Sequence, residues 1–94
     1  MIKYDKIIIT PKDIIKIQQI AIRYNGDRNL IMSSDEYTTL MYSVIKQSNV
    51  TYKEQLITQE LVENNEELAF KFADLIVIIA TEFAKLLDNK KKDI

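Results

Sequence analysis

Residues 68 to 87 form the stretch LAFKFADLIVIIATEFAKLL, which decides the fold of this chain. At 100° per residue its apolar side chains cover an arc of roughly 220°, whereas a surface helix needs a stripe of about 100°. The remaining strip is polar apart from Ile78, and it holds Lys71, Asp74, Thr81, Glu82 and Lys85. A helix this apolar must be covered from at least two sides. The sequence therefore predicts the central helix of a bundle.

Composition restricts both the fold and the chemistry. The 94 residues are 47% hydrophobic and 29% charged, which predicts one packed helical domain spanning residues 1–94. One Gly and one Pro are too few for a fold built from strands and tight turns. The absence of Cys and His removes thiol chemistry, the commonest metal ligand and the commonest acid–base group at neutral pH. We therefore expect a protein that is not an enzyme, with no cofactor, no catalytic residues and no metal site.

Export and membrane segments are not evident in the sequence. The start contains three consecutive apolar residues, Ile7 to Ile9, whereas a secretory signal needs about 7–15. The longest apolar run is Leu75 to Ala80, and a transmembrane helix needs about 20 residues. We expect a soluble, cytoplasmic protein.

The N-terminal residues predict an extended arm followed by a helix. Ile7 to Ile9 are β-branched, and the arm either lies along the bundle as a strap, which we favour, or pairs with the arm of a second copy. Thr10, Pro11 and Asp13 have the spacing of an N-cap, a first helical residue and a capping-box acid. Asn25-Gly26 is typical of a helix C-terminus, although the same pair also turns β-hairpins.

A loop over residues 25–33 and two further helices are expected before the long one. The second helix begins at Ser33 or Ser34, and its apolar residues fall at i, i+3, i+4, i+7 and i+8: Tyr37, Leu40, Met41, Val44 and Ile45. The third spans about residues 52–63, where the apolar pattern is weak. Asn64 or Asn65 then begins the long helix, unless one helix is continuous from 52 to 88. Lysines 90–92 suit the helix C-terminus and are expected to fray.

Together these elements predict an all-α fold. It is a compact antiparallel bundle of three to four helices, with a long, largely buried C-terminal helix and a short extended N-terminal arm.

Charge is distributed unevenly along the chain. Residues 1–47 have a net charge of +2 and residues 48–94 a net charge of −3. The acidic residues that gather in the second half are Glu54, Glu60, Glu63, Glu66 and Glu67. A solvated polar face accounts for them most simply, but such a face also suits contact with another protein. We take these five glutamates as the candidate partner-binding surface.

The sequence of this region also allows a DNA-recognition helix or a metal site. A helix-turn-helix would place Gln55, Thr58 and Gln59 on a recognition helix, but the glutamates around them oppose phosphate binding, and Lys12, Lys16, Arg23 and Arg28 would have to reach the DNA backbone. Glu60, Glu63 and Glu67 have the spacing to share a face and to bind Mg²⁺ or Ca²⁺. An exposed acidic surface is the simpler interpretation of these three residues.

The apolar arc of the long helix exceeds what three shorter helices cover. We expect a homodimer, with an oligomer interface formed by Val62, Phe70, Val77 and Ile78. A groove for another protein is the alternative.

Residue usage that favours Ile, Lys and Asn is typical of AT-rich coding in low-GC bacteria, phages, plasmids and other mobile elements. We expect a small non-catalytic regulatory or inhibitory protein that binds another protein. A DNA-binding transcriptional regulator is the less favoured alternative, and no membrane partner is expected.

Overall fold

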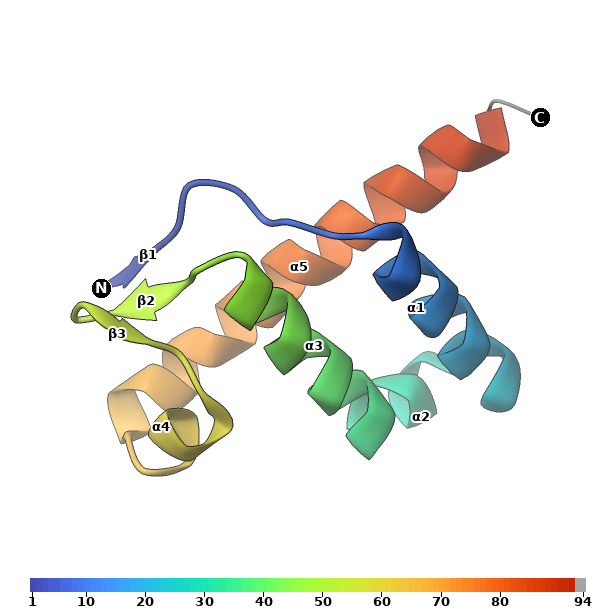
Figure 1. Ribbon diagram of the computed structural model, residues 1–94. Coiled ribbons are helices and arrows are strands. Elements are labelled where there is room, and N and C mark those ends of the chain that lie inside the picture. Colours follow the sequence, from blue (N-terminus) through green and yellow to red (C-terminus); the bar gives the residue numbers. More distant parts are fainter. Residues whose placement is uncertain (93–94) are drawn as a thin grey trace.

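The computed structural model describes the backbone of residues 1–92 and the side chains of residues 1–88 (Figure 1). Within this range the helices are α1 (Pro11–Arg23), α2 (Arg28–Ser33), α3 (Asp35–Gln47), α4 (Gln59–Glu63) and α5 (Glu66–Lys92). The predicted helical bundle with a long C-terminal helix is confirmed. The predicted role of lysines 90–92 lies outside the described side chains.

A small sheet accompanies the helices. Its strands have two residues each: β1 (Ile2–Lys3), β2 (Thr51–Tyr52) and β3 (Gln55–Leu56), antiparallel in the order β1-β2-β3. Ile2 pairs with Tyr52, and Thr51 pairs with Leu56. The sheet ties the N-terminal arm to the middle of the chain.

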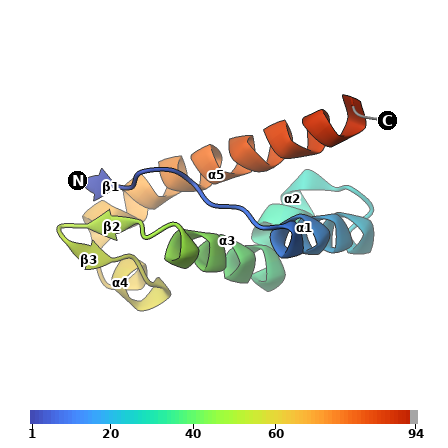
Figure 2. The same ribbon diagram turned by 45° about the horizontal axis from the view of Figure 1, so that its top comes forward.

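Helix α5 runs along the whole molecule. Its 27 residues span about 40 Å at 1.5 Å per residue, close to the longest dimension of 42 Å. Figure 2 shows α1, α2 and α3 on one side of α5. Phe70, Val77 and Ile78 of α5 are exposed, so part of the apolar arc is uncovered and the expectation of cover from two sides or more is wrong.

The core lies between α3 and α5. On α3 the five residues predicted from the periodicity are all buried: Tyr37, Leu40, Met41, Val44 and Ile45. On α5 the buried ridge consists of Leu68, Leu75, Ile79 and Phe83, all within the predicted apolar arc. The rings of Tyr42 and Phe72 stack beside it, with centroids 5.0 Å apart.

Helix α1 begins and ends where the sequence predicts. The Thr10 hydroxyl accepts a hydrogen bond from the Asp13 N–H at 3.3 Å, and the Asp13 carboxylate accepts one from the Thr10 N–H at 2.9 Å, which completes the capping box. Asn25 and Gly26 have φ values of 54° and 73° and end the helix, so the hairpin alternative is wrong. The loop predicted for residues 25–33 instead contains α2, with Asp27 as its N-cap.

A β-hairpin replaces the first half of the predicted third helix. Lys53 and Glu54 form its turn with φ values of 49° and 67°, the left-handed conformation that a two-residue hairpin turn requires. Tyr52 is buried in the core, and β1 pairs with the free edge of β2. Tertiary pairing with the arm thus outweighs the weak helical pattern of this segment. The helix expected at 52–63 is reduced to α4.

Helix α5 starts separately from α4. The Asn65 side chain accepts a hydrogen bond from the Leu68 N–H at 3.0 Å, so Asn65 is the N-cap. A continuous helix from residue 52 to 88 is therefore wrong.

The N-terminal arm lies along the molecule as a strap, as favoured from the sequence. The Ile8 N–H donates to the Ser48 hydroxyl at 2.8 Å, and the Gln47 amide donates to the Ile8 carbonyl at 2.7 Å. The same amide nitrogen donates to the Asp13 carboxylate at 2.6 Å. The end of α3 therefore holds both the arm and the first turn of α1.

Among the described residues, no helix is both long enough and apolar enough to cross a membrane.

Candidate protein-binding surfaces

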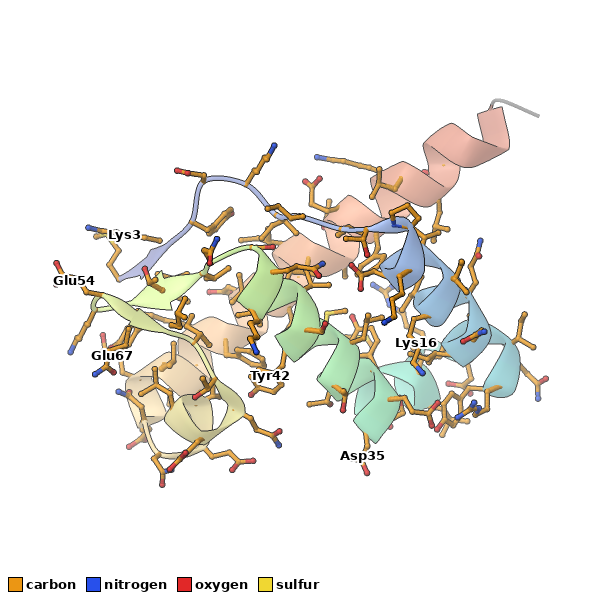
Figure 3. All side chains as sticks on the ribbon, viewed as in Figure 1. Lys3, Lys16, Asp35, Tyr42, Glu54 and Glu67 are labelled. Atoms are coloured by element: carbon orange, nitrogen blue, oxygen red, sulfur yellow. The ribbon has the colours of Figure 1, made fainter. Side chains whose placement is uncertain are left out.

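The five predicted partner-binding glutamates come from three elements. Glu54 is in the hairpin turn, Glu60 and Glu63 are on α4, and Glu66 and Glu67 are in the first turn of α5. All five are exposed. Figure 3 shows Glu54 and Glu67 at the end of the molecule that the hairpin, α4 and the start of α5 form together. We call this region the acidic end.

An apolar hollow opens at the acidic end, between β3 and α4. It has a volume of about 370 Å³ and is lined by Gln55, Leu56, Thr58, Glu60, Leu61 and Asn64. Leu56 is 53% exposed, and Leu61 is half-buried. An apolar centre with a polar and charged rim is the usual composition of a protein–protein interface. Of the five predicted glutamates, Glu60 lines the hollow; the hollow itself was not predictable from the sequence because it exists only once the hairpin has formed.

Glu67 differs from the other four glutamates. Its carboxylate lies 3.1 Å from the Lys71 ammonium, and the hydrogen bond from Lys71 lowers the pKa of Glu67 below its ordinary value. The ammonium groups of Lys71 and Lys53 also lie over the Tyr52 ring, 5.8 Å and 5.3 Å from its centroid. Glu67 therefore already has a cationic partner on its own helix.

A shared metal site does not form here. Among the described residues, no group of three acidic side chains is placed to hold one metal ion. The spacing of Glu60, Glu63 and Glu67 would align them only on one continuous helix, and the break before Asn65 separates α4 from α5.

The segment expected to supply a DNA-recognition helix has another structure. Gln55 lies in β3, Thr58 is the N-cap of α4, and Gln59 is the first residue of this five-residue helix. Arg23, one of the basic residues considered for backbone contacts, forms an ion pair with Glu36. The predicted helix-turn-helix geometry is therefore wrong.

The four predicted interface residues are not brought together. Val62 is only 8% exposed and belongs to the core, because α4 turns it toward α5; its assignment to uncovered surface is wrong. Ile78 lines a hollow beneath the arm with Met1, Ile2 and Tyr4. Phe70 and Val77 are 75% and 60% exposed. These last two belong to a separate apolar face of α5.

A groove runs along this exposed face of α5. Val77, Ala80, Ala84 and Leu87 line one side, and Ile31 and Met32 of α2 line the other. Its volume is about 320 Å³. The α2 wall of this groove was not predicted, because the sequence favours a loop over residues 25–33.

A further groove of about 600 Å³ separates α1 from α3. Ile15 and Leu40 line it, and its rim carries Lys16 on α1 and Asp35 on α3, both visible in Figure 3. Ile15 is 56% exposed and lies on a different surface from both the acidic end and the α5 groove. It therefore provides a matched control position for variants at the other two surfaces.

Comparison with known proteins leaves these surfaces as the basis for any functional argument. No protein-family model, no curated protein and no solved structure matches this chain.

Proposed function

We propose that this protein is a small non-catalytic regulator or inhibitor that binds another protein through its acidic end. The observation that supports this most directly is the hollow between β3 and α4, where Leu56 is exposed beside Leu61 and Glu60 lines the same hollow. Contiguous exposed apolar side chains with a polar rim are typical of an interaction site.

The two kinds of residue have different roles in this proposal. Leu56 and Leu61 bury apolar surface against the partner and slow dissociation. Glu54, Glu60, Glu63 and Glu66 attract a basic rim on the partner and accelerate association. The partner surface that fits is therefore an apolar protrusion surrounded by Lys or Arg.

The acidic end is also held in place before binding. β1 pairs with β2 and β2 with β3, and α4 packs against α5 with Val62 in the core. A surface fixed in this way loses little conformational entropy on binding.

The lack of cysteine suits a reducing compartment, and we propose that the protein acts in the cytoplasm. Residue usage suggests a low-GC bacterium, phage or plasmid as its setting. A lysate of such a host is the natural source in which to search for the partner.

Capture from that lysate with the immobilised protein tests the proposal. The captured protein should be lost with Leu56→Asp and weakened by Glu60→Gln/Glu63→Gln. Its association rate with the wild-type protein should fall as salt concentration rises. Ile15→Asp is the matched control because Ile15 and Leu56 are almost equally exposed, and this variant should bind normally.

Two results would overturn the proposal. One is a captured protein that Leu56→Asp releases no more than Ile15→Asp does. The other is salt-dependent binding of random duplex DNA at micromolar protein, which would establish the DNA-binding alternative instead.

A further inference from the structure

The exposed face of α5 carries a regular apolar pattern of its own. Its residues recur at alternating intervals of three and four: Phe70, Ala73, Val77, Ala80, Ala84 and Leu87. All six are exposed or half-buried, and none belongs to the buried ridge that faces α3. This is the a/d spacing of helices that pack side by side. Helix α5 thus has one apolar face for its own core and a second without a partner among the described residues.

The pattern is symmetric about its own midpoint. Large residues, Phe70 and Leu87, stand at the two ends, and the smaller alanines and Val77 lie between them. If a second α5 lies antiparallel across the first, each of the six residues faces the residue at the mirrored position of the other copy. The register pairs Phe70 with Leu87, Ala73 with Ala84, and Val77 with Ala80, each time between copies. A helix from an unrelated protein would not require such symmetry.

The charges beside this face have the same symmetry. Lys71 and Asp74 flank one end, and Lys85 and Asp88 flank the other. In the antiparallel register Lys71 approaches Asp88 of the second copy, and Asp74 approaches Lys85. In a parallel pair these residues would face the side of the partner helix that carries Ile76 and Phe83, so the opposite charges would not meet. Lys71 and Lys85 also form ion pairs within the helix, with Glu67 and Glu82. These pairs are exposed and weak, so the lysines can form ion pairs with the second copy instead.

From this symmetry of size and charge we propose that a second copy of the chain covers the exposed face of α5 in antiparallel orientation. The contact runs for about 26 Å at 1.5 Å per residue. Ile31 and Met32 of α2, on the far wall of the groove, extend it sideways. Helices α1, α2 and α3 lie on one side of α5 (Figure 2), which leaves room for a second helix on the other side.

This inference goes beyond the proposed function because it concerns a different surface. The hollow at the acidic end lies between β3 and α4 and is not part of the α5 stripe. Loss of the dimer with retained partner capture would therefore refute only the present inference, and the reverse result would refute only the proposed function.

Size-exclusion chromatography with light scattering tests the dimer. At micromolar concentration the wild-type protein should have twice the 11.0 kDa chain mass. Val77→Glu should be monomeric with unchanged far-ultraviolet circular dichroism, because Val77 is exposed in the single chain. Ile15→Glu, at a similarly exposed position, should remain dimeric.

A wild-type monomer at about 100 µM, far above the micromolar working range, would overturn the proposal, as would a Val77→Glu dimer. If Val77→Glu fails to fold, Ala84→Glu changes the same face at another exposed position, and a dimer of that variant would equally refute the contact.

A distance measurement tests the orientation. The chain has no Cys, so Glu66→Cys can be spin-labelled at a single site. In the antiparallel register the two labels lie about 25 residues apart along the axis, or roughly 38 Å. In a parallel pair they would lie within about 20 Å, because packed helix axes are roughly 8–10 Å apart. The shorter distance would contradict the antiparallel arrangement.

Discussion

At the scale of single residues, Asp13 has the most exacting environment. It is only 6% exposed, yet its carboxylate accepts hydrogen bonds from Thr10 and from Gln47. Burial by itself raises the pKa of Asp13, but the hydrogen bonds from the Thr10 N–H, the Gln47 amide and the Thr10 hydroxyl outweigh it and lower the pKa below its ordinary value. The ionised form is therefore the one that the fold stabilises.

We expect Asp13→Ala to lower the free energy of unfolding by about 1–3 kcal/mol, because it removes the cap and leaves the Gln47 amide without its acceptor. A lowered pKa in the folded state means that Asp13 contributes its full stability above the pKa of the unfolded state. That contribution is lost as the pH falls through the folded-state pKa. Urea unfolding at pH 7 and at pH 3 measures both effects.

The exposed arm residue Asp5 is the control for this change, and Asp5→Ala should have little effect. If Asp13→Ala loses as much stability as the wild-type protein between pH 7 and pH 3, the hydrogen bonds to Asp13 do not cause the acid sensitivity.

At the scale of elements, the arm is the least obvious feature of the fold. Its strand β1 pairs with β2. The Ile8 N–H donates to the Ser48 hydroxyl, and the Ile8 carbonyl accepts from the Gln47 amide. The sequence predicts the extended conformation of the arm but gives no sign of its partner strand. Lys53-Glu54 is not a recognised turn pair, and the residues that pair with β1 lie about 50 positions away, beyond the reach of local patterns.

Elements with purely local causes were predicted well. Thr10 and Asp13 cap α1, and the apolar spacing of α3 places five side chains in the core. Only part of the candidate site could be predicted from the sequence, for the same reason. Glutamates are visible in any sequence, but the exposure of Leu56 and the burial of Val62 depend on a hairpin that long-range pairing creates.

Ser48→Ala should loosen the arm without unfolding the bundle. It removes the acceptor of the Ile8 N–H, and the loss of one such hydrogen bond, about 1 kcal/mol, corresponds to about a fivefold faster amide exchange. Hydrogen exchange followed by NMR at Ile8 measures it. Ser43→Ala, at an exposed position of α3, should leave the exchange rate of Ile8 unchanged. If Ser43→Ala accelerates exchange at Ile8 as much as Ser48→Ala does, the loss of the Ser48 hydrogen bond is not the cause.

At the scale of the whole molecule, α5 supports two different surfaces. Ile79 is fully buried against α3, whereas Val77 is mostly exposed two residues earlier. Removing side-chain volume from these two positions should therefore have different consequences for the isolated chain and for the proposed dimer.

Ile79→Ala should lower the free energy of unfolding by about 2–5 kcal/mol at any protein concentration, because it leaves a cavity in the core. Val77→Ala should cost about 0.5 kcal/mol or less in the dilute monomer and more as concentration rises, since dimerisation stabilises the folded state by mass action. Urea unfolding at two protein concentrations distinguishes the two. A concentration-independent cost for Val77→Ala would mean that this side chain contacts nothing outside its own chain.

The contacts that hold the arm can form only after a later part of the chain has been synthesised. Ile8 bonds to a residue 40 positions later in the chain, and Ile2 pairs with Tyr52. At roughly 5–20 residues per second, the arm leaves the ribosome several seconds before its partners Ser48 and Tyr52 leave it. During that interval the arm is exposed to solvent, including Ile7, Ile8 and Ile9. A chaperone that recognises short aliphatic segments would bind it at this stage.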